Sequence, residues 1–84
     1  MMYDLIISNS LTYAHQGLFI LTKAQIPAFV VRTPRSIGTF GCSYAIRVNS
    51  GMGRIAAKVL RENHFPHGRI FTLYPNGSIG EVLP

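Results

Sequence analysis

The chain has 84 residues, 48% of them hydrophobic and 13% charged, and it contains one cysteine. This length predicts a single domain over residues 1–84, the composition excludes an intrinsically disordered protein, and one cysteine excludes an internal disulfide. The formal net charge is +5 and most basic residues are arginine, which favours an anionic partner. The N-terminus resembles no signal peptide and no apolar stretch reaches about 20 residues, so we expect a cytoplasmic protein without membrane contact.

The first half of the chain alternates between strand and helix patterns. Residues 3–8 are short and β-branched, which predicts a strand. Asn9 and Ser10 are typical N-cap residues, and apolar side chains then recur at helical spacing over residues 11–24. Pro27 ends this helix, and residues 28–33 predict a second strand.

The second half repeats the strand and helix patterns. Residues 43–49 predict a strand. Asn49 and Ser50 then predict the N-cap of a second helix, whose apolar stripe runs through residues 52–60. Residues 69–74 predict a fourth strand.

The C-terminal residues indicate a hairpin. Asn76-Gly77 favours a type I′ turn, and residues 79–83 would return as a short edge strand. The order β-α-β-β-α-β predicts an α+β, ferredoxin-like fold: a four-stranded antiparallel sheet with two helices on one face, extended by this edge strand. This topology would gather Ser8, Asn9, Ser10, Cys42 and residues 64–67 at one end of the sheet.

Cys42 ends the long connection between the second and third predicted strands. A plain hairpin needs only two to five residues, so the length of this connection favours a site over a connector. Arg35 in the same connection, Arg47 in the next strand and the first turn of the first helix all favour an anion there. Gly41 frees the backbone to present amides. A buried, structural cysteine is the competing interpretation.

Other classes of site find little support in the sequence. His15, His64 and His67 show no metal-ligand spacing, and their role stays open. The chain has no phosphate-loop or dinucleotide fingerprint, so we expect no cofactor, and no acidic residue is placed to orient a histidine beside Cys42. The third predicted strand lacks the aromatic pattern of RNA-binding sheets, which disfavours nucleic acid as the partner.

The sequence resembles a family of small selenium/sulfur carrier-like proteins over roughly residues 3–73. The similarity lies in Ser10 and Ala14, residues 24–27, residues 33–37, and Cys42 leading into an apolar strand that contains Arg47. The family often has glycine after the cysteine, where this chain has Ser43.

The resemblance implies that Cys42 holds a persulfide or selenopersulfide, which donor and acceptor proteins would supply and remove. Five residues would stabilise this anion: Arg35, Arg47, Gly41, Ser43 and Ser10. The alternative is a non-catalytic interaction or regulatory domain. Its open sheet face, carrying Arg32, Arg47 and aromatic residues of the fourth strand, would pair with a second copy or with a partner.

Overall fold

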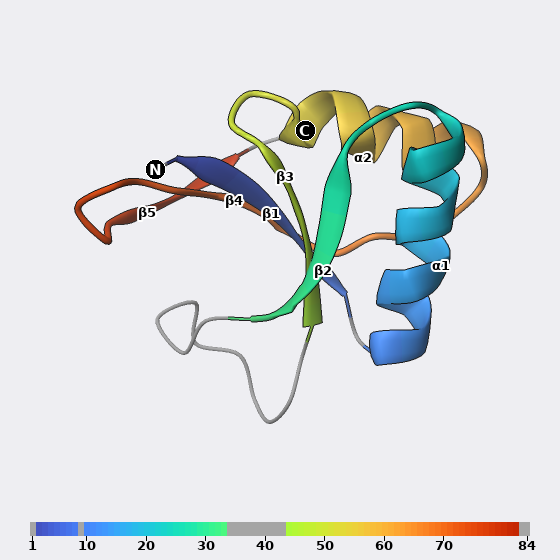
Figure 1. The fold of residues 1–84 in the computed structure, drawn as a ribbon, viewed down its shortest axis with the longest axis horizontal. Helices are drawn as coiled ribbons and strands as arrows, with labels where there is room; N and C mark the ends of the chain where they lie inside the picture. Colours follow the sequence, from blue (N-terminus) through green and yellow to red (C-terminus); the bar gives the residue numbers. More distant parts are fainter. Residues whose placement is uncertain (1, 9, 34–43, 83–84) are drawn as a thin grey trace.

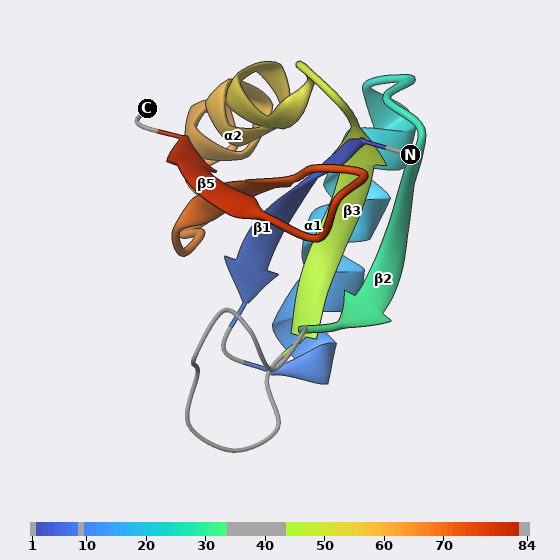
Figure 2. The same ribbon diagram turned by 90° about the vertical axis from the view of Figure 1, so that its left-hand side faces the viewer.

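A computed structural model describes residues 2–8, 10–33 and 44–82. Its elements, in chain order, are β1 (Tyr3–Ser8), α1 (Leu11–Lys23), β2 (Ala28–Arg32), β3 (Tyr44–Asn49), α2 (Gly53–Glu62), β4 (Ile70–Leu73) and β5 (Ile79–Val82). The strands form one antiparallel sheet in the order β2-β3-β1-β4-β5. Both helices lie on the same side of this sheet (Figures 1 and 2). The predicted ferredoxin-like α+β fold with an extra edge strand is confirmed.

The core lies between the sheet and the two helices. The strands contribute Ile6, Ile46, Val48 and Ile70 to it. The helices contribute small or apolar side chains that let them approach the sheet closely: Ala14, Leu21, Ala56, Ala57 and Leu60. Since successive residues of a strand point to opposite faces, Leu5, Ala45 and Arg47 lie on the other face of the sheet.

Arg32 lies on the helix side of the sheet, contrary to the sequence prediction. It pairs in register with Tyr44, and its guanidinium carbon is 5.9 Å from the centroid of the Tyr44 ring. Tyr44 and Val30, two residues before Arg32, both pack against the core. The open sheet face therefore carries Arg47 but not Arg32.

The N-terminus of α2 is capped from another strand. Its N-cap residue is Met52, which makes no side-chain hydrogen bond there, so the predicted Asn49–Ser50 cap is wrong. Instead, the Oδ2 atom of Asp4 accepts hydrogen bonds from the amides of Gly51 (3.2 Å) and Gly53 (2.9 Å). A carboxylate suits this place because the first amides of a helix are unpaired and carry partial positive charge.

The C-terminal hairpin exists, but its turn is not of type I′. A type I′ turn needs positive φ at both central residues, whereas Gly77 has a φ of 87° and Asn76 is not among the residues with positive φ. The Gly77 amide donates to the Tyr74 carbonyl, and the Tyr74 amide donates to the Ser78 carbonyl. Pro75 and Asn76 are thus the central residues of the turn, and Gly77 follows them in the left-handed region.

Candidate functional site

One end of the sheet brings together the residues that the topology predicted there. Ser8, the last residue of β1, is the register partner of Tyr44, the first residue of β3. Ser10 then begins α1 as its N-cap, and its Oγ accepts a hydrogen bond of 3.1 Å from the Tyr13 amide. The Ser8 hydroxyl donates to the Ser10 carbonyl at 3.2 Å. The chain turns tightly here, and the Ser10 side chain holds one amide of the first helical turn.

The segment after α2 returns to the same end of the sheet. The Gly68 amide donates to the Ile7 carbonyl at 2.9 Å. A Cβ atom on Gly68 would lie 2.7 Å from that carbonyl oxygen, so only glycine permits this approach. A hollow of about 170 Å³ results, lined by Ser8, Tyr13, Pro66, His67 and Gly68. Of the predicted gathering, the described residues thus show Ser8 and Ser10 beside Pro66 and His67, while Asn9 and Cys42 lie outside the described residues.

His67 is the histidine at this end with the most defined surroundings. Its Nδ1 lies 2.7 Å from the Gly68 carbonyl oxygen, to which only a protonated nitrogen can bond. The Nε2 atom lies 3.4 Å from Nη1 of Arg61, so it accepts a hydrogen bond from that guanidinium. No local sequence pattern predicts this contact, because Arg61 lies on α2 and His67 lies in the segment that follows it.

Arg47 lies at a different place from the Ser8–Ser10 turn. It sits in the middle of β3, on the sheet face opposite the helices, in register with Phe29 and Leu5. Its guanidinium carbon is 5.3 Å from the ring centroid of Tyr3 and 5.0 Å from that of Phe29. The cation is therefore held between two aromatic rings, a favourable arrangement for arginine. Ser10, on α1, belongs to the helix side of the sheet.

The remaining predicted site residues are Arg35, Gly41, Cys42 and Ser43, and all of them lie outside the described residues. The described residues nearest to them in the chain are Thr33, which is buried, and Tyr44.

The other two histidines do not line this hollow. His15 is exposed on α1, and His64 follows α2 with a φ of 57°. Within residues 2–8, 10–33 and 44–82, no group of three histidine, cysteine, aspartate or glutamate side chains could hold a metal ion. None of the helices in these ranges is long and apolar enough to cross a membrane.

Comparison with known proteins identifies one family. The family model described as "Putative Se/S carrier protein-like" matches residues 3–72. No curated protein and no solved structure matches the chain. The match covers the elements from β1 to α2 and most of β4, and it includes the segment that contains Cys42.

Proposed function

We propose that this chain, which belongs to the Se/S carrier protein-like family, carries a sulfur or selenium atom on Cys42 and delivers it to an acceptor enzyme. One observation carries the proposal: the family match spans residues 3–72, and Cys42 is the only cysteine of the chain. A persulfide or selenopersulfide forms on a thiolate, so no other side chain can hold the atom.

The loading step is an exchange between two sulfur atoms. The Cys42 thiolate attacks the terminal sulfur of a donor persulfide, R–S–SH. The bond between the two donor sulfurs breaks, and its electron pair leaves with the donor thiolate, R–S⁻, while Cys42 becomes Cys–S–SH. With R–S–SeH as the donor, the same exchange yields Cys–S–SeH. One persulfide and one thiolate stand on each side of this exchange, so no net oxidation occurs. The step therefore needs neither a cofactor nor a separate oxidant.

Several features of the chain support an anion at Cys42. Arg35 shares the connection with Cys42, and Gly41 and Ser43 contribute the neighbouring backbone amides. This connection rejoins the sheet at Tyr44, which is the register partner of Ser8. Ser8 in turn lies two residues before the Ser10 cap of α1. The amides of the first turn of α1 add partial positive charge at that end. Each of these lowers the pKa of a nearby thiol and stabilises the charged persulfide.

Arg35 and Arg47 have different parts in the proposal. Arg35 would stabilise the persulfide by direct contact. Arg47 is held between Tyr3 and Phe29 on the open sheet face, so it would act only through its field. Replacing Arg35 with alanine should therefore slow alkylation of Cys42 at neutral pH and raise the apparent thiol pKa. Arg47→Ala should do so to a smaller extent. An unchanged pH profile of alkylation in Arg35→Ala would remove Arg35 from the mechanism.

Mass spectrometry of the intact protein tests the carrier proposal. The protein is isolated without reductant, or incubated with a low-molecular-weight persulfide, and its mass is measured before and after treatment with dithiothreitol. We expect the increment of one sulfur or selenium atom, which dithiothreitol removes. Cys42→Ser should show no increment and an unchanged urea unfolding curve. A wild-type chain that stays unmodified in excess persulfide would contradict the proposal.

The alternative function, an interaction domain that pairs through its open sheet face, also has an observation in its favour. Phe29 is 59% exposed on that face, an unusual position for a large aromatic side chain. Thiol reactivity separates the two functions. A carrier needs an accessible thiol that reacts faster than a free cysteine at neutral pH, whereas an interaction domain tolerates a slow one.

A further inference from the structure

The two helices differ in what they present to solvent. The outward face of α2 is largely charged, and its exposed side chains include Arg54, Lys58, Arg61 and Glu62. By contrast, α1 has no acidic residue and exposes large apolar or aromatic side chains: Leu11 is 42% exposed, Tyr13 47% and Phe19 63%. A helix at a solvated surface normally has a polar outer face. The outer face of α1 therefore has the character of an interface.

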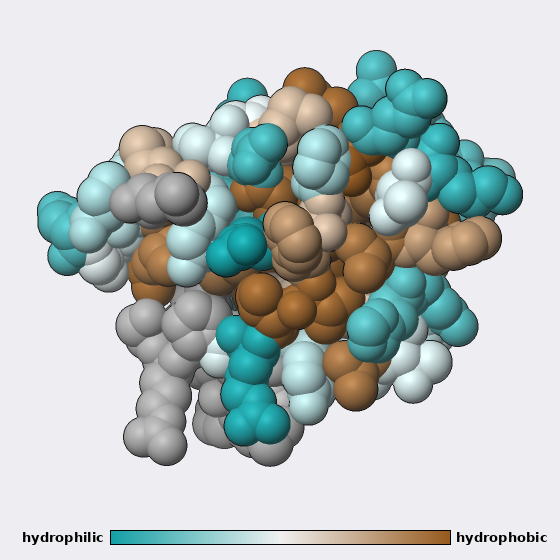
Figure 3. Space-filling model, viewed as in Figure 1, coloured by the Kyte–Doolittle hydropathy of each residue, from teal (hydrophilic) through white to brown (hydrophobic). Residues whose placement is uncertain are grey.

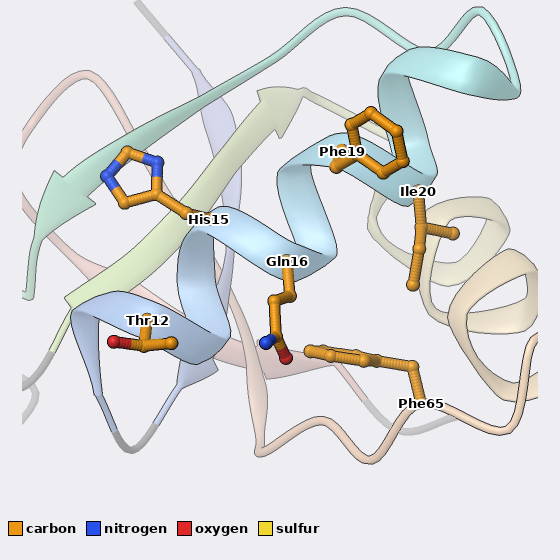
Figure 4. A pocket seen from close by; sticks show the side chains of 6 residues that line it. All are labelled: Thr12, His15, Gln16, Phe19, Ile20 and Phe65. Carbon is orange, nitrogen blue, oxygen red and sulfur yellow. The ribbon is translucent and has the colours of Figure 1, made fainter.

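A shallow groove follows this outer face. One hollow of about 590 Å³ is lined by Thr12, His15, Gln16, Phe19, Ile20 and Phe65 (Figure 4). A second hollow of about 430 Å³ is lined by Phe19, Ile20, Lys23, Ala24 and Asn63. The two hollows adjoin at Phe19 and Ile20, which line both, and we call them together the α1 groove.

The surface of the larger hollow is mainly apolar. Figure 4 shows Gln16 and Ile20 pointing toward the Phe65 ring, while His15 and Phe19 project from the other side of the helix. Phe65 is fixed in place by an edge contact with Tyr13, whose ring centroid is 5.7 Å away. Figure 3 shows apolar surface over the region where Figure 1 draws α1 and β2, with hydrophilic side chains around it.

The charges around the groove select its occupant. No acidic residue lines either hollow, and Lys23 lies at one end with its Nζ 5.3 Å from the centroid of the Phe19 ring. Two of the three acidic residues of the chain have partners of their own within the domain: Asp4 caps α2, and Glu81 pairs with Arg69. A second copy of this chain, itself with a net charge of +5, would bring mostly like charge to the groove.

We infer that the α1 groove binds an acidic protein segment with apolar anchor residues, presented by the acceptor enzyme of the carried atom. This inference rests on the proposed function. The groove starts at Thr12, two residues after the Ser10 cap, at the end of the sheet where the Cys42 connection rejoins β3. A partner seated along the groove thus reaches that end of the sheet at Thr12, while Lys23 lies at the other end of α1.

Peptide titration monitored by ¹H–¹⁵N NMR tests the inference. The probe is a synthetic amphipathic peptide with leucine at i, i+3, i+4 and i+7 and glutamate elsewhere, and its counterpart has lysine in place of glutamate. We expect the acidic peptide to shift the amide signals of α1 and of Phe65, and the basic peptide to leave them unchanged. Equal binding of both peptides, or shifts centred on β3 or α2, would overturn the inference, as would no binding at millimolar peptide.

Matched variants locate the binding surface. Phe19→Glu should weaken binding of the acidic peptide by about tenfold or more, the scale of one lost anchor. Ile55→Glu is the control, because Ile55 is also an exposed apolar residue (50%, against 63% for Phe19), and it lies on α2 outside the groove. It should change the affinity by less than roughly twofold. Equal losses in the two variants would contradict a site in the groove.

Two further measurements separate this inference from other outcomes. Amide signals of α1 that shift with protein concentration alone would show that a second copy occupies the groove, and would overturn the acidic partner. Loading of Cys42 by a low-molecular-weight persulfide needs no docking, so Phe19→Glu should load as the wild type does. If the wild type does not load, the carrier proposal fails, whatever the peptide does. If it loads but the acidic peptide does not bind, only the docking inference fails.

Discussion

Replacing Asp4 with alanine should destabilise the domain more than any other single change of a polar side chain described above. Asp4 is 3% exposed and its carboxylate accepts three hydrogen bonds. Two come from the Gly51 and Gly53 amides at the start of α2, and the third, of 2.8 Å, comes from the Thr72 hydroxyl on β4. One side chain therefore connects the sheet to the helix and two neighbouring strands to each other.

The size of the loss follows from these contacts. Removing the carboxylate leaves the Gly53 amide buried without an acceptor, at about 1–3 kcal/mol. Losing the cap and the favourable charge at the helix N-terminus adds about 1–2 kcal/mol. The expected loss for Asp4→Ala is therefore about 2–5 kcal/mol, a large part of the stability of a small domain.

Urea unfolding, followed by circular dichroism, measures these losses. Thr72→Val is the matched control, because it removes only the third bond and should cost about 1 kcal/mol. Asp4→Asn keeps an acceptor oxygen and a similar volume, so it should cost less than Asp4→Ala and serves as the milder variant if alanine prevents folding. A loss below about 1 kcal/mol in Asp4→Ala would refute the capping role.

Two further predictions concern the approach at Gly68 and the ion pair of the C-terminal hairpin. Gly68→Ala places a Cβ 2.7 Å from the Ile7 carbonyl oxygen, a backbone atom that cannot rotate away, and should cost about 1–3 kcal/mol in urea unfolding. Gly80→Ala, whose Cβ would meet an aromatic ring at 3.5 Å, should stay within about 0.5 kcal/mol, and equal losses would contradict the steric argument. Hydrogen bonds and charge from Arg69 hold the pKa of Glu81 below its ordinary value. The stability advantage of the wild type over Glu81→Gln should thus be present above about pH 4.3, the ordinary value, and disappear as the pH falls through the lowered pKa. An advantage that persists at pH 2 would refute this.

The sequence predicts the elements well because their signals are local. Apolar spacing of two or of 3.6 residues is visible in any short window, and the described strands and helices lie within a residue or two of the predicted ranges. The N-cap of α1 is local too, since Ser10 bonds to the amide only three residues later. The helical spacing also places Phe19 on the outer face of the predicted helix, but the spacing alone assigns no function to this aromatic residue.

The misjudged features depend on partners that are distant in the chain or on competition between neighbours. Asp4 and Gly53 are 49 residues apart, so no local pattern reports their hydrogen bond. In the hairpin, Pro75 favours the first central position of a type I turn, and this preference overrides the Asn-Gly signal for type I′. The Ser8–Ser10–His67 end followed from topology, whereas the aromatic neighbours of Arg47 depend on the register of β3 with β1 and β2.

The central place of β1 in the sheet has a consequence for how the chain folds. β1 is synthesised before the other strands, yet its neighbours in the sheet, β3 and β4, come from residues 44–49 and 70–73. The last hydrogen bond of Asp4, from Thr72, also has to wait for β4. At about 5–20 residues per second, the ribosome exposes both hydrogen-bonding edges of this apolar strand for several seconds before they can be paired. Chains that stop before residue 70 keep one of these edges open and should aggregate rather than fold. We therefore expect a chaperone to bind the nascent chain before β4 has been synthesised.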